Sequence, residues 1–197
     1  MVILYMSLSY IVGSISGSLI LGKFWNIDIR KLGSGNAGGT NALRSVGIKF
    51  AFLTFIIDLT KGIIPAYLAS HDISLMLMCG GAAIIGHVYP IFYNFRGGKG
   101  AGTLLGVLII ALPESIIYII STWVIVLVIS GYVGLSTILG VLTFLFYCIA
   151  YSSYHYILFS IMVFFLILFT HISNIRRMIV GKENQFPKVM LFNKKGS

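Results

Sequence analysis

The segment FAFLTFIIDLTKGIIPAYLA, residues 50–69, indicates what class of protein this is. It is an almost unbroken apolar run of the ~20 residues that a helix needs to cross the hydrocarbon core of a bilayer. Its only charged side chains, Asp58 and Lys61, are three positions apart and therefore lie on one face of such a helix. Charges inside a membrane are costly unless they are paired. The segment therefore predicts a membrane span with either a mutual Asp58–Lys61 ion pair that orients a helix bundle, or Lys61 at the edge of an anion-binding pocket.

The rest of the chain has the same character as this segment. Of its 197 residues, 58% are hydrophobic and only 10% are charged, which is far from the composition of soluble globular proteins. An integral membrane protein of this length has little chain left for a separate soluble domain. The apolar runs predict seven spanning helices, at Val2–Leu21, Phe50–Ala69, Ser74–Phe92, Gly98–Leu112, Glu114–Ser130, Val133–Tyr151 and Tyr154–Ile172.

The basic residues give these helices a direction across the membrane. The chain carries fourteen of them and a net charge of +9, and all except Lys61 fall on one side of the seven predicted helices. They are Lys23, Arg30, Lys31, Arg44, Lys49, Arg96, Lys99, Arg176, Arg177, Lys182, Lys188, Lys194 and Lys195. Such a bias marks the cytoplasmic side. We therefore predict an all-α membrane protein with seven transmembrane helices, the N-terminus outside, the C-terminus cytoplasmic, and short cytoplasmic helices or glycine-rich loops.

The first polar segment on the cytoplasmic side is GSGNAGGTN, residues 33–41. It matches the dinucleotide-binding pattern G-x-G-x-x-G, but no strand precedes it and no βαβ unit surrounds it, so the match is accidental. Its glycines instead allow backbone N–H groups to approach an anion. We expect Asn36 to cap a short helix through Arg44, whose N-terminus favours negative charge. The alternative is a flexible surface connector.

The second polar segment is NFRGGKGAGT, residues 94–103. It is not a Walker A loop, because Tyr93 and Gly100 stand where that motif needs glycine and a hydroxyl. Glycines still surround Lys99 just before a predicted helix, which suits an anion-binding nest with one point charge. The alternative is a plain turn with Lys99 reaching for the headgroups. His87, at the end of the preceding span, is by itself more typical of a packed, hydrogen-bonded residue than of a catalyst.

The third polar segment is THISNIRRMIVGKE, residues 170–183. His171 and Asn174 are three apart, so we expect them on one helix face. Arg176 and Arg177 are also what any cytoplasmic flank of a span contains, which is the simpler explanation of their presence.

Several chemistries are excluded by the residues that the chain lacks. It contains no H-x-x-x-x-D pair, no G-x-S-x-G elbow and only five carboxylates, so neither a two-metal centre nor any other cofactor is expected. Cys79 and Cys148 lie within apolar runs and are expected to be packing residues. What remains is a cytoplasmic, anion-binding pocket at the lipid boundary, suited to a phosphate-bearing molecule that meets an acyl chain. A transporter of a phosphorylated solute and a purely structural membrane subunit are the competing interpretations.

Four segments, taken in order, resemble one known family. They are LGSGNAGGTNALR, DLTKGIIPA, GHVYPIFYNFRGGKG and HISNIRRMIVGKE. They are similar to the bacterial membrane glycerol-3-phosphate acyltransferases that use acyl phosphate as donor. The resemblance implies a single acyltransferase domain over residues 1–183, a basic tail over 184–197, and transfer of the acyl chain to the 1-hydroxyl of glycerol 3-phosphate. The products would be 1-acylglycerol 3-phosphate (lysophosphatidic acid) and phosphate.

The resemblance and the anion-binding argument together imply a set of site residues. The candidate catalytic residues are Lys99, Arg44 and His171, with His87 or the departing phosphate as alternative proton acceptors. The candidate substrate-binding residues are Ser34, Gly35, Asn36, Thr40, Asn41, Gly97, Gly98, Gly100, Ser136, Asn174 and Glu183. Two places depart from the family's usual pattern: Thr170 stands where an arginine is common, and residues 134–137 read GLST rather than a Ser-Leu-Ala-Ser type.

The expected partners and location follow from the same interpretation. The ligands would be acyl phosphate, glycerol 3-phosphate and membrane lipid, with neither nucleic acid nor an obligate protein partner. The protein would cross the bacterial inner (cytoplasmic) membrane several times and carry its active site on the cytoplasmic face.

We predict that single cysteines at Gly39 and Lys194, in a variant without Cys79 and Cys148, are labelled by a membrane-impermeant maleimide from the cytoplasm. A cysteine at Asp72 should be labelled from outside, because an odd number of spans separates it from each of the other two. Labelling of positions 39 and 72 from the same side would contradict the seven-helix arrangement.

Overall fold

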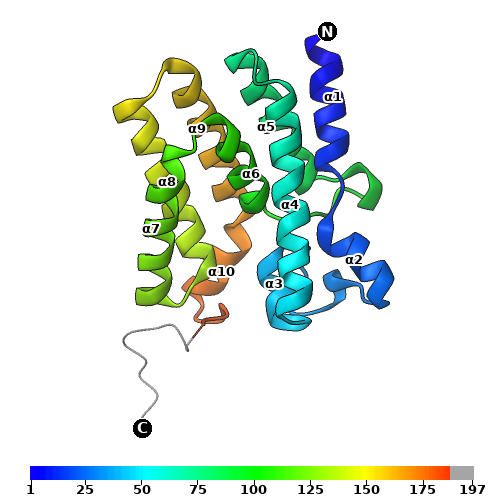
Figure 1. Ribbon diagram of the computed structural model, residues 1–197. Coiled ribbons are helices and arrows are strands. Elements are labelled where there is room, and N and C mark those ends of the chain that lie inside the picture. Colours follow the sequence, from blue (N-terminus) through cyan, green and yellow to red (C-terminus); the bar gives the residue numbers. More distant parts are fainter. Residues whose placement is uncertain (187–197) are drawn as a thin grey trace. The chain divides into compact units, whose positions relative to one another are not determined.

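The computed structural model describes residues 1–186, and every regular element among them is helical (Figure 1). The α-helices are α1 (Val2–Gly13), α2 (Gly17–Trp25), α3 (Gly39–Ser45), α4 (Ile48–Leu68), α5 (Ile73–Val88), α6 (Ala101–Ala111), α7 (Glu114–Ser130), α8 (Val133–Tyr151), α9 (Tyr154–Thr170) and α10 (Ile172–Ile179), with 3₁₀ turns η1 (Ile29–Lys31) and η2 (Ile91–Tyr93). The all-α prediction is confirmed. The chain forms two compact units, Met1–Pro113 and Glu114–Ser197. The predicted single domain over 1–183 stays a prediction, and most of the predicted tail, with Lys188, Lys194 and Lys195, lies outside the described residues.

Each of the seven predicted spans contains a helix, but the helices differ in length. Among residues 1–186, four segments are long and apolar enough to cross a membrane, namely Val2–Trp25, Ile48–Leu68, Ile73–Tyr93 and Val133–Tyr151. The pair α9 and α10 would make a fifth if counted as one span bent by 51°. Helices α6 and α7 are apolar but shorter. These findings support a multi-pass membrane protein, while seven spans remain a prediction.

The first span is not the continuous helix that the hydrophobic pattern predicted. It breaks between α1 and α2, where Ser16 adopts an extended conformation. The hydroxyl of Ser14 donates a hydrogen bond to the carbonyl of Tyr10 at 2.8 Å, a local contact that competes with helical hydrogen bonding. The second half of the span then continues to Trp25, four residues beyond the predicted end.

Helices α4 and α6 pack with their backbones in close approach. A methyl group at Gly62 would collide with the carbonyl oxygen of Thr103, and one at Gly106 with that of Leu59. Small residues are the usual means by which membrane helices reach such short separations, since lipid provides little hydrophobic drive between them.

Helices α1 and α5 also approach each other closely at glycines. A methyl group at Gly13 would collide with the backbone of Ala83, and one at Gly86 with the carbonyl oxygen of Tyr10. The hydroxyl of Tyr10 also donates to the carbonyl of Tyr89 at 2.7 Å. These contacts hold the first half of the broken span against the helix that leads to the second polar segment.

The second unit is built from α7 to α10. Helices α7 and α8 are joined by a Thr122–Thr143 hydroxyl contact of 3.0 Å, and Phe144 of α8 meets Phe159 of α9 edge to face. After α10 the chain turns back to the α7–α8 connection, where the N–H of Phe186 donates to the carbonyl of Gly131 at 2.9 Å.

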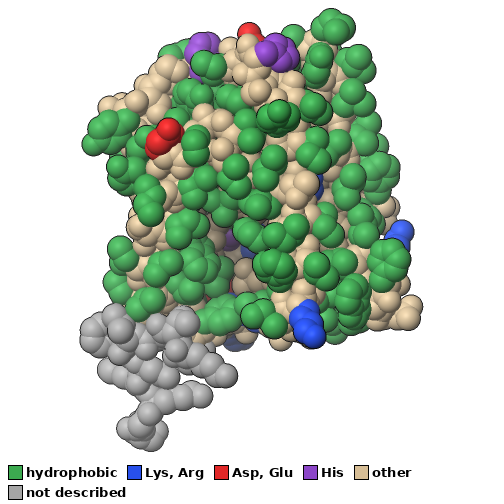
Figure 2. Space-filling model, viewed as in Figure 1, with side chains coloured by type: hydrophobic (Ala, Val, Ile, Leu, Met, Phe, Trp, Pro, Cys, Tyr) green, Lys and Arg blue, Asp and Glu red, His purple; other side chains and the backbone are tan. Residues whose placement is uncertain are grey.

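The outward surfaces of the helices are apolar. Phe52 of α4, Ile117 of α7 and Phe165 of α9 are each more than half exposed, and Figure 2 shows hydrophobic side chains over most of the visible face. A soluble protein rarely exposes such continuous apolar surface, whereas lipid chains cover it without cost.

We predict that Gly106→Ala destabilises the protein and Gly102→Ala does not. The first methyl group collides with backbone, whereas the second meets its nearest atom, the Cβ of Asp58, at 3.6 Å. Overpacking costs about 1–3 kcal/mol, which for a chain of this size lowers the melting temperature by about 5 °C. Thermal unfolding in detergent is the measurement, and equal melting temperatures for both variants would contradict the packing described for α4 and α6.

Candidate active site

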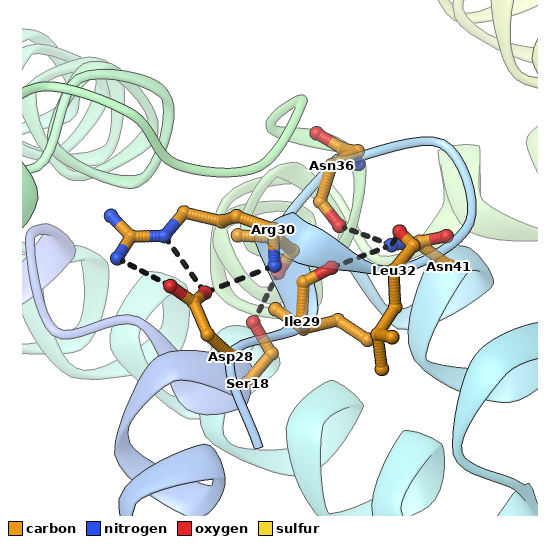
Figure 3. A network of polar contacts seen from close by, with 8 residues as sticks. Ser18, Asp28, Ile29, Arg30, Leu32, Asn36 and Asn41 are labelled. Carbon is orange, nitrogen blue, oxygen red and sulfur yellow. Dashed lines mark hydrogen bonds and ion pairs between the residues drawn. The ribbon is translucent and has the colours of Figure 1, made fainter.

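The loop between α2 and α3 is organised by the buried side chain of Asn41 (Figure 3). Its amide nitrogen donates to the carbonyls of Ile29, Leu32 and Asn36 at 3.2, 2.9 and 3.0 Å. Its oxygen accepts the backbone N–H of Ser34 at 2.9 Å. One side chain therefore closes the loop, which needs an amide because a carboxylate cannot donate.

Two further contacts fasten this loop. The hydroxyl of Ser18, on α2, donates to the carbonyl of Ala37 at 2.6 Å. Asp28 caps η1 by accepting the N–H of Arg30 at 3.1 Å, and it also pairs with the Arg30 guanidinium at 3.0 Å. The hydrogen bond from the Arg30 side chain holds the pKa of Asp28 below its ordinary value. Ile29 lies fully buried beneath the loop in an apolar cluster with Leu19.

The engaged backbone groups change the expected role of the glycines. The N–H of Ser34 donates to Asn41, and that of Gly35 donates to the carbonyl of Leu32 at 3.0 Å. Gly33 has a φ of +54° and lies against Asn41, so glycine is needed there for conformation and space. The geometry thus leaves anion binding mainly to side chains of this segment.

The short helix after the loop begins differently from the prediction. Gly38 is the N-cap residue of α3, and no side chain caps it, so the expectation that Asn36 is the cap is wrong. The carbonyl of Asn36 is instead held by Asn41. The helix does carry Arg44 in its last turn, as expected, and this side chain is half-buried.

The second loop is fastened to the end of α5. The N–H of Gly97 donates to the carbonyl of Val88, and the N–H of Gly98 to that of His87, both at 3.1 Å. A methyl group at Gly98 would collide with the His87 imidazole. These two N–H groups are therefore satisfied within the fold. The two glycines allow the chain just before half-buried Lys99 to lie close to the end of α5.

The two loops of the first unit come together through Tyr93. Its ring, on η2, packs against the apolar cluster that contains Ile29 and Ala37. The segments that carry Arg44 and Lys99 therefore belong to one end of this unit, while the side of the membrane that this end faces stays a prediction.

A buried charge network lies next to the second loop. The Lys61 ammonium lies 2.9 Å from the Asp58 carboxylate, which confirms the mutual ion pair among the two alternatives. His87 Nδ1 lies 3.4 Å from the same carboxylate, while the other side of its ring faces Gly98. His87 is thus a packed residue, with its ring buried between α4 and the second loop.

The second unit holds the remaining candidates. The chain bends by 51° between α9 and α10, where His171 is the N-cap residue of α10 and Asn174 lies in its first turn. That the two share one helix face stays a prediction. His171 Nδ1 lies 2.8 Å from the carbonyl of Ile167, and a carbonyl only accepts. In the neutral ring the proton therefore sits on Nδ1, and Nε2 is the basic nitrogen.

Glu183 closes the segment after α10. Its carboxylate accepts hydrogen bonds from the Asn174 amide at 2.7 Å and from the Arg177 guanidinium at 2.6 Å. Asn174 packs against Gly134, where a methyl group would lie only 3.0 Å from it. The fully buried hydroxyl of Ser136 donates to the carbonyl of Tyr132 at 2.9 Å.

Comparison with known proteins identifies the family. A family model described as glycerol-3-phosphate acyltransferase matches residues 3–181. The chain belongs to this family. Curated glycerol-3-phosphate acyltransferases from Finegoldia magna and Alkaliphilus metalliredigens are 40% and 41% identical, over 91% and 90% of this chain and 93% and 92% of their own lengths.

Solved structures of the family share the fold of this acyltransferase. The crystal structure of PlsY (YgiH), an integral membrane glycerol 3-phosphate acyltransferase, matches in its glycerol 3-phosphate form with a TM-score of 0.89 and 34% identity, over 94% of this chain and 95% of that one. Its lysophosphatidic acid form matches with a TM-score of 0.87 and 33% identity, over the same shares.

Two supporting contacts in this acyltransferase involve residues that the sequence did not single out. Ser18 looked like one more small residue in an apolar run, and nothing in the local pattern marks it as the anchor of a carbonyl nineteen positions away. Arg177 looked like an ordinary flank residue. The lone acidic residue among the described residues after α10, Glu183, was the available sign that a basic neighbour would pair with it.

We predict that Asn41→Asp lowers kcat/KM for glycerol 3-phosphate about ten-fold or more. The substitution keeps the shape but places a carboxylate oxygen against three carbonyls that now lack a donor. Ser45→Ala is the matched control, since its hydroxyl makes only a 3.4 Å contact to Asn41. Steady-state kinetics of both purified variants decide, and an Asn41→Asp enzyme with unchanged kinetics would contradict the role of Asn41 in closing the loop.

Proposed function

We propose that the protein transfers an acyl chain from an acyl phosphate to the 1-hydroxyl of glycerol 3-phosphate, and releases 1-acylglycerol 3-phosphate and phosphate. The observation that carries this proposal is the match of nearly the whole chain to PlsY, whose two matching structures are described as glycerol 3-phosphate and lysophosphatidic acid forms. One form names the acceptor and the other the product of such a reaction.

The cations of the first unit are the proposed phosphate ligands. Arg44 offers a planar fork that grips a phosphate through two hydrogen bonds, and Lys99 offers a point charge. Because the N–H groups of Ser34, Gly35, Gly97 and Gly98 are already engaged, we assign Asn41, Gly35, Gly97 and Gly98 to shaping the loops. The hydroxyl and amide side chains of Ser34, Asn36 and Thr40, and the backbone at Gly100, remain proposed contacts to substrate.

The proposed reaction needs little covalent participation by the protein. An acyl phosphate is an activated mixed anhydride: the acceptor oxygen bonds to the acyl carbon, the bond between that carbon and the phosphate oxygen breaks, and phosphate departs with its electron pair. The protein must hold two anionic groups together and stabilise the oxyanion that develops on the acyl carbonyl, which positioned cations do well.

The proton of the acceptor hydroxyl needs a base. We propose His171, whose Nδ1–H contact with the Ile167 carbonyl fixes the neutral tautomer with a basic Nε2, or the departing phosphate itself. His87 is the weaker candidate, because its buried ring is occupied by Asp58 on one side and Gly98 on the other. Ser136, Asn174 and Glu183 are also proposed to act in substrate binding.

The proposal includes a setting for the reaction. Seven spans with an external N-terminus would place Arg44 and Lys99 at the cytoplasmic face of a bacterial inner membrane. The donor would enter from the bilayer through its acyl chain, since short loops offer little of the ~800 Å² that a carrier protein needs for docking. Neither a metal nor a protein partner is required by this mechanism.

We predict that the purified protein makes 1-acylglycerol 3-phosphate from palmitoyl phosphate and glycerol 3-phosphate without added metal. Arg44→Ala and Lys99→Ala should each lower kcat/KM at least about 100-fold, because each removes charge stabilisation from an anionic reaction. Lys49→Ala and Arg96→Ala are matched controls, since both side chains are exposed cations, Lys49 in the first turn of α4 and Arg96 in the same loop as Lys99. The cysteine-free variant should stay active.

Two outcomes would contradict the proposed function. Turnover with palmitoyl-coenzyme A at the rate seen with palmitoyl phosphate would refute the donor assignment. Uptake of radiolabelled glycerol 3-phosphate into proteoliposomes, without product formation when acyl phosphate is supplied, would favour a transporter instead.

A further inference from the structure

The break in the first span releases backbone groups inside an apolar environment. Helix α1 ends at Gly13 and α2 begins at Gly17, so carbonyls at the end of α1 and N–H groups at the start of α2 lose their helical partners. Ser16 is the N-cap residue of α2, yet its buried hydroxyl has no hydrogen-bond partner. Within a membrane such groups are tolerated only where other parts of the protein satisfy them.

One ion pair on α4 meets both ends of the break. The Lys61 ammonium donates to the carbonyl of Ile15 at 2.8 Å, and the Asp58 carboxylate lies 3.4 Å from the N–H of Gly17. The C-terminal end of a helix carries partial negative charge and the N-terminal end partial positive charge. The ammonium therefore lies at the end of α1 that favours a cation, and the carboxylate at the end of α2 that favours an anion.

The same pair extends to the second loop. Asp58 lies 3.4 Å from His87 Nδ1, and the His87 ring lies directly against Gly98. The carbonyl of His87 also receives the N–H of Gly98 at 3.1 Å. In the other direction, α2 carries Ser18, whose hydroxyl holds the carbonyl of Ala37 in the first loop.

We propose that Asp58, Lys61 and His87 are positioning residues that set the geometry of both substrate-binding loops. The Asp58–Lys61 pair acts through the order of its two charges, which fixes the start of α2 and hence the first loop. His87 transmits the position of the ion pair to the turn before Lys99. This inference rests on the proposed function, because it names what aligns that site. An ion pair that only tied helices together would do so with its two charges in either order. The positioning role requires the cation at the end of α1 and the anion at the start of α2.

Two double variants separate the polarity from the mere presence of charge. Asp58→Lys combined with Lys61→Asp keeps a buried pair but turns each charge toward the wrong helix end. Asp58→Asn combined with Lys61→Met removes both charges and leaves no unpaired ion. Thr60→Ala is the matched control, because its hydroxyl bonds only within α4, to Ile56.

We expect the neutral pair to fold, to keep kcat within about three-fold and to raise KM for glycerol 3-phosphate about ten-fold. The reversed pair should be worse than the neutral pair in KM or fail to fold, because its charges oppose both helix ends. Wild-type KM in the reversed pair would overturn the proposal, and so would wild-type KM in the neutral pair.

A second measurement does not depend on the reaction. Ile29→Cys, in a cysteine-free background, places a smaller thiol in the buried cluster under the first loop. Its maleimide labelling should be at least about five-fold faster in the neutral pair than in the parent or with Thr60→Ala. If the parent protein lacks acyltransferase activity, the proposed function fails, whereas unchanged labelling in the neutral pair refutes the positioning role alone.

The part of His87 is tested by coupling. His87→Leu keeps a side chain of similar size against Gly98 but removes the contact to Asp58. We compare the rise in KM, relative to wild type, of the neutral pair, of His87→Leu alone and of the two combined. If His87 transmits the position of the ion pair, the rise in the combined variant is clearly less than the product of the two separate rises. Effects that multiply would show that His87 acts independently and would remove it from the proposal.

Discussion

The Asp58–Lys61 ion pair at the break in the first membrane span is the contact on which the first unit depends. A continuous helix would have satisfied its own backbone. Beyond the break, Ser18 of α2 is hydrogen-bonded to the first loop, and the released carbonyl and N–H groups are met by the two charges of α4. Burial of two charges is tolerated because each has a partner of opposite sign and a helix end that favours it.

The candidate site differs from familiar phosphate-binding loops in how it uses glycine. In those loops the backbone N–H groups point at the anion. Here the N–H groups of Gly35, Gly97 and Gly98 are bonded within the fold, and the glycines serve close approach and unusual conformation. The proposed work of holding phosphate then falls to Arg44 and Lys99. We propose that supporting contacts position this site, so changes at Asn41 or Ser18 are expected to alter substrate binding through the loop that these residues hold.

In the second unit, polar contacts of Glu183 have a similar supporting role. Its carboxylate joins Asn174 near the start of α10 to Arg177 in the last turn, and so fixes the chain that folds back after this helix. The bend at His171 leaves the Nδ1 proton directed to the Ile167 carbonyl. The Nδ1 contact with a carbonyl makes Nε2 the basic nitrogen of the neutral ring, and this is the reason for proposing His171 as the proton acceptor.

The sequence by itself predicted the helical membrane class and the position of each apolar segment, and it gave the pairing of Asp58 with Lys61 as one of two alternatives. These properties depend on composition and on spacing along one helix, which are local and therefore legible in the chain. It also indicated the four segments that carry the family resemblance. The family was confirmed by comparison, while the site residues remain proposals.

Only the tertiary structure decided where the helices break and where the polar groups of the loops find partners. The break near Ser16 is permitted by Lys61, forty-five positions away, and the loop of residues 26–38 is closed by Asn41. The hydrophobic pattern of a span is identical whether or not its backbone is interrupted. The run GSISGS at residues 13–18 is a local sign of a weak helix, but it does not say which residues meet the released backbone groups. The break and the closed loop are both decided by the requirement that every buried carbonyl and N–H be satisfied. That requirement is met only by residues that folding brings near.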